Sequence, residues 1–254
     1  MAAERTRTGH EPGPNSAVLT FHSLDTSGSV ISFAPELFRA RMEALAESGP
    51  PVVPLLECLR RPGTIALTFD DGFVNFATEA WPVLRRLGLP VTLFVVSGRV
   101  GKTNGWNPRG AKIPELPLLD WPALRELWGG GVELGAHSHT HFDLTRVPGE
   151  RLDDEFELPL RMIQERVGTR PRTFAYPYGK VSPWVQTKAA EYYQAACGTA
   201  MGYCRKGDNP HDVRRLDAYY LRGRVGPADV LCAGGMRWMT ARGWARRLRS
   251  ALGG

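Results

Sequence analysis

Apolar residues along the chain recur in two alternating patterns. Short runs of β-favouring apolar residues predict strands at residues 17–21, 65–69, 91–96, 132–136, 173–175 and 194–197. Apolar residues at helical spacing predict helices at residues 35–47, 75–87, 120–128, 149–167 and 183–193. Pro159 should kink the fourth helix or begin a new turn. Strands and helices in alternation predict parallel strands and right-handed crossovers, hence an α/β barrel or an open doubly wound sheet.

Two terminal stretches depart from this alternation. Residues 1–16 are polar and rich in glycine, proline and charge, so they are expected to form a flexible segment before a single domain at residues 17–254. They contain no apolar stretch of the kind that a secretion signal needs. Residues 238–249 are basic, amphipathic and contain tryptophan. This pattern favours a helix that caps the domain, and a membrane anchor is the less favoured alternative.

Composition narrows the class of protein. With 254 residues, of which 43% are hydrophobic, the chain can bury the core of one barrel-sized domain. The net charge of +6 spreads over 32 basic and 26 acidic residues, so it describes a mildly basic surface and predicts no nucleic-acid partner. No run of 18 apolar residues predicts an integral membrane segment. Four scattered cysteines indicate reduced thiols and a cytoplasmic protein.

The first candidate for chemistry is the stretch TFDDG at residues 68–72, directly after an apolar run. A buried strand that ends in two acids would deliver carboxylates to the rim of a sheet or barrel. If the chain is still extended at Asp70 and Asp71, their side chains point to opposite sides, so one can bind a cation while the other acts as a base. Gly72 permits a sharp turn. The alternative is a surface turn that closes the strand.

The second candidate is the stretch HSHTH at residues 137–141, which follows the predicted strand at 132–136. Imidazoles four residues apart can reach one cation from a single turn, and a neutral histidine is a favoured zinc ligand. Two histidines and one carboxylate leave a catalytic metal with open positions for water and substrate, and Asp71 would complete that set. The alternative is a solvated polar loop.

These two stretches, together with FAYPYG at residues 174–179, resemble the first three motifs of the polysaccharide deacetylase family. This family is also called the NodB-homology domain or carbohydrate esterase family four. The order and spacing match over roughly residues 17–221. The resemblance implies a distorted (β/α) barrel and a divalent-metal deacetylase that acts on N-acetylated sugars.

The resemblance also implies roles for individual residues. It makes Asp70 the general base and Asp71, His137 and His141 the metal ligands. It makes the backbone N–H of Tyr178 a donor to the oxyanion that forms when water attacks the amide carbonyl. The expected metal is one zinc ion, with nickel and cobalt as alternatives.

The sequence departs from the commonest family pattern in two places. Ala175 replaces the arginine that usually opens the third motif and orients the base; Arg215 could restore the charge, or it could be a surface arginine. The late motif that carries the acid histidine is absent, and His211 lies in a turn-like stretch where a loop role is expected. His22, at the end of the first strand, resembles the N-terminal histidine that supplies the acid in permuted members of the family. His139 occupies the variable position of its motif and is expected beside the site.

The sequence therefore predicts a cytoplasmic hydrolase that removes an N-acetyl group from an amino sugar or a sugar-containing intermediate. Trp106, Trp121 and Trp184 are candidates for a sugar platform or for core packing. The alternative enzyme is a deformylase or another amide or imide hydrolase of the same fold. The alternative from another class is a degenerate barrel that binds glycan without turnover, which Ala175 supports and the acid and histidine set opposes. The sequence indicates no oligomeric state.

Overall fold

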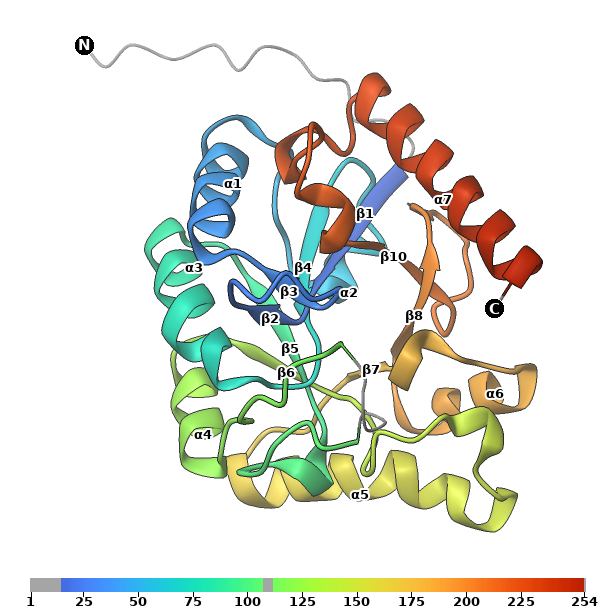
Figure 1. Cartoon of the computed structure of the whole chain (residues 1–254). Helices are drawn as coiled ribbons and strands as arrows, with labels where there is room; N and C mark the ends of the chain where they lie inside the picture. Colours follow the sequence, from blue (N-terminus) through green and yellow to red (C-terminus); the bar gives the residue numbers. More distant parts are fainter. Residues whose placement is uncertain (1–14, 107–111, 254) are drawn as a thin grey trace.

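Seven parallel strands form a closed barrel, and helices surround it (Figure 1). The computed structural model describes residues 15–106 and 112–253. The order around the barrel is β1, β4, β5, β6, β7, β8 and β10, and β10 pairs with β1 to close it. These strands are β1 (Asn15–Phe21), β4 (Ile65–Phe69), β5 (Val91–Val95), β6 (Glu133–Ala136), β7 (Thr173–Ala175), β8 (Ala195–Met201) and β10 (Val213–Asp217).

The remaining elements cover the barrel or extend its loops. Strands β2 (Ser23–Leu24) and β3 (Ser32–Phe33) pair with each other, and β9 (Cys204–Arg205) pairs antiparallel with β1. The α-helices are α1 (Pro35–Ser48), α2 (Leu55–Cys58), α3 (Trp81–Leu87), α4 (Trp121–Gly129), α5 (Gly149–Val167), α6 (Pro183–Tyr192) and α7 (Ala233–Gly253). A π-helical turn, η1 (Phe76–Ala80), precedes α3, and the 3-10 turns are η2 (Ser97–Arg99), η3 (Leu144–Arg146), η4 (Pro177–Gly179), η5 (Ala218–Leu221) and η6 (Pro227–Asp229).

The boundaries confirm most of the predicted elements and correct others. Helix α5 runs on past Pro159 as a single helix, and the strand expected at 194–197 continues to Met201. Asn15 and Ser16 belong to β1, so the expected flexible segment does not include them; residues 1–14 lie outside the described part of the chain. The C-terminal helix is longer than the predicted 238–249. Within the described residues, no helix combines the length and apolarity needed to cross a bilayer.

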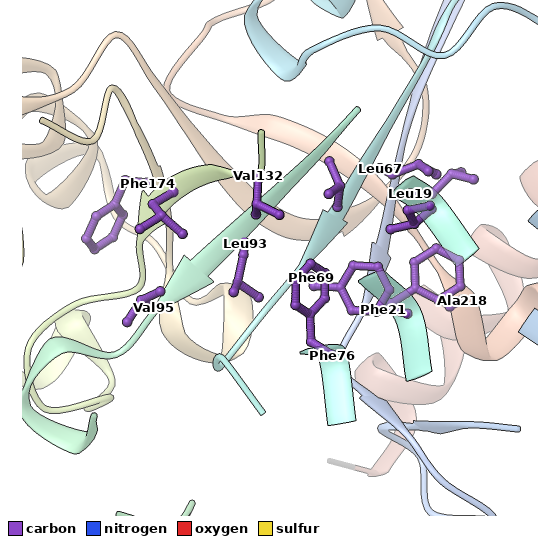
Figure 2. Close-up of a cluster of buried hydrophobic side chains, with 14 of the residues drawn as sticks. Leu19, Phe21, Leu67, Phe69, Phe76, Leu93, Val95, Val132, Phe174 and Ala218 are labelled. Carbon is purple, nitrogen blue, oxygen red and sulfur yellow. The ribbon is translucent and has the colours of Figure 1, made fainter. Parts of the chain in front are cut away.

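Successive side chains of β4 alternate between two apolar clusters. Ile65, Leu67 and Phe69 of β4 pack in the larger cluster, between the barrel and its helices, while Ala66 packs in a second cluster inside the barrel. Figure 2 shows part of the larger cluster, where Phe69 lies between Phe21 and Phe76. Its ring centroid is 5.1 Å from that of Phe21 and 4.9 Å from that of Phe76. Burial on both sides explains why these strands are apolar runs.

The barrel interior is narrow, and its residues are matched in size. Phe94 of β5 fills the space beside Gly135 of β6, where an added Cβ would collide with the Phe94 ring. Ala175 of β7 and Cys197 of β8 belong to the same interior cluster. The interior positions of successive strands lead to the carboxyl-terminal rim, where the polar residues predicted to carry chemistry lie.

Candidate active site

Strand β4 delivers two adjacent carboxylates to this rim. The backbone N–H of Asp70 still donates to the carbonyl of Phe21 on β1, at 2.9 Å, and the Asp70 side chain is buried. The condition of an extended chain at both acids is not met at Asp71, whose φ is 74°. Gly72 follows with a φ of 82°. The two carboxylates therefore separate because the chain turns tightly, and not because strand alternation continues.

Backbone strain is concentrated at this rim. Among the described residues, four that are not glycine have a positive φ, and they are Asp71, Ser138, His141 and Tyr178. Residues other than glycine adopt a positive φ at a cost in free energy, so the surrounding structure must stabilise this backbone conformation. All four belong to the three stretches that the sequence singles out, which is typical of a functional site.

The loop at residues 137–141 follows β6 and turns back on itself. The backbone N–H of His137 donates to the carbonyl of Val95 on β5, at 2.9 Å, so this residue is still tied to the barrel. The backbone N–H of His141 donates to Oγ of Ser138, at 2.9 Å. The turn places the imidazole ring centroids of His137 and His141 4.9 Å apart.

Asp71, His137 and His141 converge as the sequence predicts. Their three candidate ligand atoms lie within 4.8 Å of one another, and all three residues are buried. Oδ1 of Asp71 is 3.3 Å from Nε2 of each histidine. Nδ1 of His137 lies 2.7 Å from the carbonyl oxygen of Ala175, which can only accept, so Nδ1 carries the proton and Nε2 presents a lone pair.

This arrangement fits a divalent metal ion. Oδ1 of Asp71 is buried without a hydrogen-bond partner among the described residues, and an uncompensated buried carboxylate oxygen is costly. Burial alone would raise the pKa of Asp71, but the two imidazoles lower it below its ordinary value, so the carboxylate is anionic. One anionic oxygen and two imidazole nitrogens are a donor set that suits zinc and similar ions.

Arg215 holds the other carboxylate. Its Nη1 and Nη2 donate to Oδ1 and Oδ2 of Asp70, both at 2.7 Å, and its Nε donates to the carbonyl of Gly198 at 2.8 Å. Arg215 is 1% exposed, so the reading of it as a surface arginine is wrong. Burial alone would raise the pKa of Asp70, but the charge and hydrogen bonds of Arg215, together with His137 and His22, hold that pKa below its ordinary value. Asp70 is therefore ionised and rigidly oriented.

Arg215 supplies the arginine that is missing from the third motif, where Ala175 stands. Ala175 is small and fully buried in the barrel interior, and Arg215 brings its guanidinium to Asp70 from β10. His22, at the end of β1, is also beside Asp70: its Nε2 is 3.8 Å from Oδ2 of that residue. The rim thus places Arg215 and a second ionisable side chain around one carboxylate.

Two aromatic rings flank His141. The indole of Trp106 stacks on its imidazole, with ring centroids 4.2 Å apart and an interplanar angle of 27°. The ring of Tyr178 meets it edge to face at 4.8 Å and is 47% exposed. Tyr178 follows β7, at the end of the third motif. The sequence predicts a role for the backbone N–H of Tyr178 only. Nothing in the sequence around Tyr178 predicts the contact of its ring with His141.

The other candidates lie elsewhere or have structural partners. Nδ1 of His139 is 2.9 Å from Oγ of Ser97, and Nε2 of His211 is 2.8 Å from the carbonyl oxygen of Tyr193. His211 precedes β10, at the opposite end of the barrel from the rim. Trp121 begins α4 and packs against the core, so it is not a sugar platform. Trp184 is 55% exposed at the start of α6.

Known proteins that resemble this chain in sequence and fold are polysaccharide deacetylases. The family model described as polysaccharide deacetylase matches residues 60–196, more than half of the chain. The chain belongs to the polysaccharide deacetylase family. The predicted family, the barrel and the enzyme class are thereby confirmed, and an N-deacetylase is a hydrolase of amide bonds.

Individual relatives of this deacetylase family member are distant. It is 21% identical over 209 residues to the putative polysaccharide deacetylase YxkH of Bacillus subtilis, covering 78% of this chain and 70% of that one. It is 24% identical over 125 residues to the poly-β-1,6-N-acetyl-D-glucosamine N-deacetylase of Staphylococcus aureus, covering 46% of this chain and 40% of that one. The solved structure of IcaB from Ammonifex degensii shares the fold, with a TM-score of 0.71, 22% identity and coverage of 89% and 97%.

Proposed function

We propose that this chain removes the N-acetyl group of an amino sugar by water attack, with one divalent metal ion, most simply zinc, held by Asp71, His137 and His141. The observation that carries the proposal is the convergence of these three ligand atoms within 4.8 Å, beside the separately anchored carboxylate of Asp70. An amide resists hydrolysis because water is a weak nucleophile and an amine is a poor leaving group. The site must therefore supply a base, an acid and stabilisation of the oxyanion.

Each remaining group has one role in this proposal. When bound, the metal would supply Lewis-acid chemistry, which lowers the pKa of water and polarises the carbonyl. Asp70 accepts the proton that the attacking water loses, as the water oxygen bonds to the carbonyl carbon. The Tyr178 N–H donates to the oxygen that becomes negative. His22 donates a proton to the sugar nitrogen as the C–N bond breaks, which leaves acetate and a free amine.

The aromatic rings at the rim support a sugar substrate. Tyr178 and Trp106 present ring surface beside His141, and sugar rings pack their C–H faces on such surfaces. The named substrate of the S. aureus relative is a polymer of N-acetylglucosamine. The proposed substrate here is therefore an N-acetylglucosamine unit, whose amide carbonyl the water attacks. The proposal places the enzyme in the cytoplasm, where the four free thiols would stay reduced.

Acetate release tests this function. Purified protein, loaded with zinc and then dialysed, is incubated with N-acetylglucosamine oligomers, and acetate is measured enzymatically against a sample stripped with a chelator. The proposal predicts acetate from the loaded protein and none from the stripped one. Oligomer binding without acetate would favour the degenerate barrel, and formate release from N-formyl analogues with no acetate release would favour the deformylase alternative.

A further inference from the structure

Helix α5 buries one carboxylate that the proposed mechanism does not use. Glu155 is 5% exposed, and its Oε2 accepts hydrogen bonds from the backbone N–H groups of His139 and Thr140, both at 3.0 Å. Its Oε1 accepts from the hydroxyl of Thr140, at 2.7 Å. No Lys or Arg among the described residues forms an ion pair with it within 4.0 Å. The three donors to the Glu155 carboxylate all come from the stretch between His137 and His141.

The position of Glu155 on its helix is unusual. The buried face of α5 is otherwise apolar, with the members Leu152, Phe156, Pro159, Leu160, Ile163 and Val167. A glutamate in this face gives up its hydration, and burying a charge is expensive unless hydrogen bonds compensate it. The hydrogen bonds from the loop at residues 137–141 provide that compensation. The burial of Glu155 on α5 therefore depends on the position of this loop.

The loop needs such an anchor. Ser138 and His141 both hold a positive φ, which non-glycine residues adopt only when the surroundings enforce it. On one side the loop is tied to η2, because the N–H groups of Ser97 and Gly98 donate to the carbonyls of Ser138 and His139, at 3.2 and 2.9 Å. Those bonds satisfy carbonyl oxygens only. Glu155 accepts from the N–H groups on the other side, and without it these two partly buried groups would lose their protein partner.

We propose that Glu155 is a positioning residue for the metal centre: by clamping His139 and Thr140, it sets the placement of His141 relative to His137. The inference rests on the proposed function, because it assumes that these two histidines hold the metal. Glu155 contacts neither histidine side chain through any hydrogen bond of the described residues. Its effect on metal affinity is therefore transmitted through the loop backbone.

Two substitutions separate geometry from charge. Glu155→Ala removes all three acceptors. Glu155→Gln can reproduce the contacts, because its amide oxygen can accept from both N–H groups while its amide nitrogen donates to Oγ1 of Thr140. Glu157→Ala is the matched control, since Glu157 is an exposed glutamate on the same helix. Zinc affinity is measured by competition with a chromophoric chelator, and thermal unfolding of each metal-free protein is recorded separately.

The proposal predicts that Glu155→Ala binds zinc about 10- to 100-fold more weakly than wild type. Glu155→Gln and Glu157→Ala should bind within a few-fold of wild type. Zinc affinity in Glu155→Ala equal to that of Glu157→Ala would overturn the proposal, even if its unfolding temperature falls, because the role would then be structural. An equal loss in Glu155→Gln would also overturn it, because charge and not positioning would then matter.

A further variant covers the case in which Glu155→Ala does not fold. Thr140→Val keeps the shape of the side chain and removes one of the three hydrogen bonds, so zinc affinity should fall about fivefold. Unchanged affinity in Thr140→Val would then contradict the proposal. If the wild-type protein itself binds no zinc, the proposed function fails and not the role of Glu155, so the two failures are distinguishable.

Discussion

Arg215 and Asp70 are joined by two parallel hydrogen bonds of 2.7 Å, although they lie 145 residues apart in the sequence. Their strands, β10 and β4, are the two neighbours of β1 in the barrel. The guanidinium therefore reaches past one strand, β1, to the carboxylate. This contact removes the main argument for a degenerate barrel, because the base has an arginine partner although the usual motif position holds Ala175.

The first prediction concerns this contact. Arg215→Ala should lower kcat for acetate release by about 100-fold while zinc content stays near wild type, because it disorients the base and leaves the metal ligands untouched. It should also lower the free energy of unfolding by about 3–5 kcal/mol, since it strands a buried carboxylate. Kinetics, elemental analysis and denaturant unfolding measure the three effects. Wild-type kcat in this variant would contradict the positioning role.

A second substitution in the same background is the matched control. Ala175→Arg, added to Arg215→Ala, returns the arginine to the position that the family motif usually gives it. Because Arg215→Ala empties the interior space, the new side chain has room to reach Asp70. The double variant should recover part of the lost kcat, whereas no recovery would show that the β10 position is required for more than charge.

The second prediction concerns the metal. His141→Ala should lose most of the bound zinc and with it the activity, because a site with three protein ligands tolerates the loss of one poorly. His211→Ala is the control, since the His211 ring lies beside the Tyr193 carbonyl at the other end of the barrel. Elemental analysis after dialysis decides: full zinc occupancy in His141→Ala would reject the ligand assignment.

The third prediction assigns the acid. His22→Gln should keep the fold and the zinc but slow amide hydrolysis by about 100-fold or more, because the amine must be protonated to leave. An activated ester, whose leaving group needs no proton, should suffer much less. Parallel assays of an N-acetyl substrate and a nitrophenyl ester make the comparison. The same proportional loss on both would mean that His22 has another role.

The fourth prediction concerns the barrel interior. Gly135→Ala should lower the free energy of unfolding by about 1–3 kcal/mol, since the added methyl group collides with the Phe94 ring. Gly149→Ala is the control, because nothing lies within 4 Å of its added Cβ. Denaturant unfolding of both variants measures the difference. Equal stability would mean that the interior is less tightly packed than the structure shows.

Local patterns in the sequence predict much of this architecture. Residues 65–69 and 149–167 match β4 and α5 to the residue, because burial on both sides makes β4 an apolar run interrupted only by Thr68 and burial on one side gives α5 its helical spacing. The convergence of Asp71, His137 and His141 was also predictable. Parallel strands end at one rim, so polar residues placed directly after strands come together there.

Features that depend on distant partners were not predictable in the same way. The left-handed backbone of Asp71 is held by the surrounding fold. An aspartate in a sequence predicts a positive φ much less strongly than a glycine does. The local sequence makes a surface role for Arg215 at least as plausible as a role beside the base, because its partner Asp70 is 145 residues away. The clamp by Glu155 left one trace, an acid within an apolar helical face, but only the folded chain shows which N–H groups it meets.

The most direct test of the account is the metal content and turnover of Asp70→Asn. The amide is nearly isosteric and can still contact Arg215, but it cannot accept the proton of the attacking water. The account predicts zinc near the wild-type level together with a fall in acetate release of about 100-fold or more. Loss of zinc would show that Asp70 and Asp71 have exchanged roles, and wild-type acetate release would contradict the mechanism.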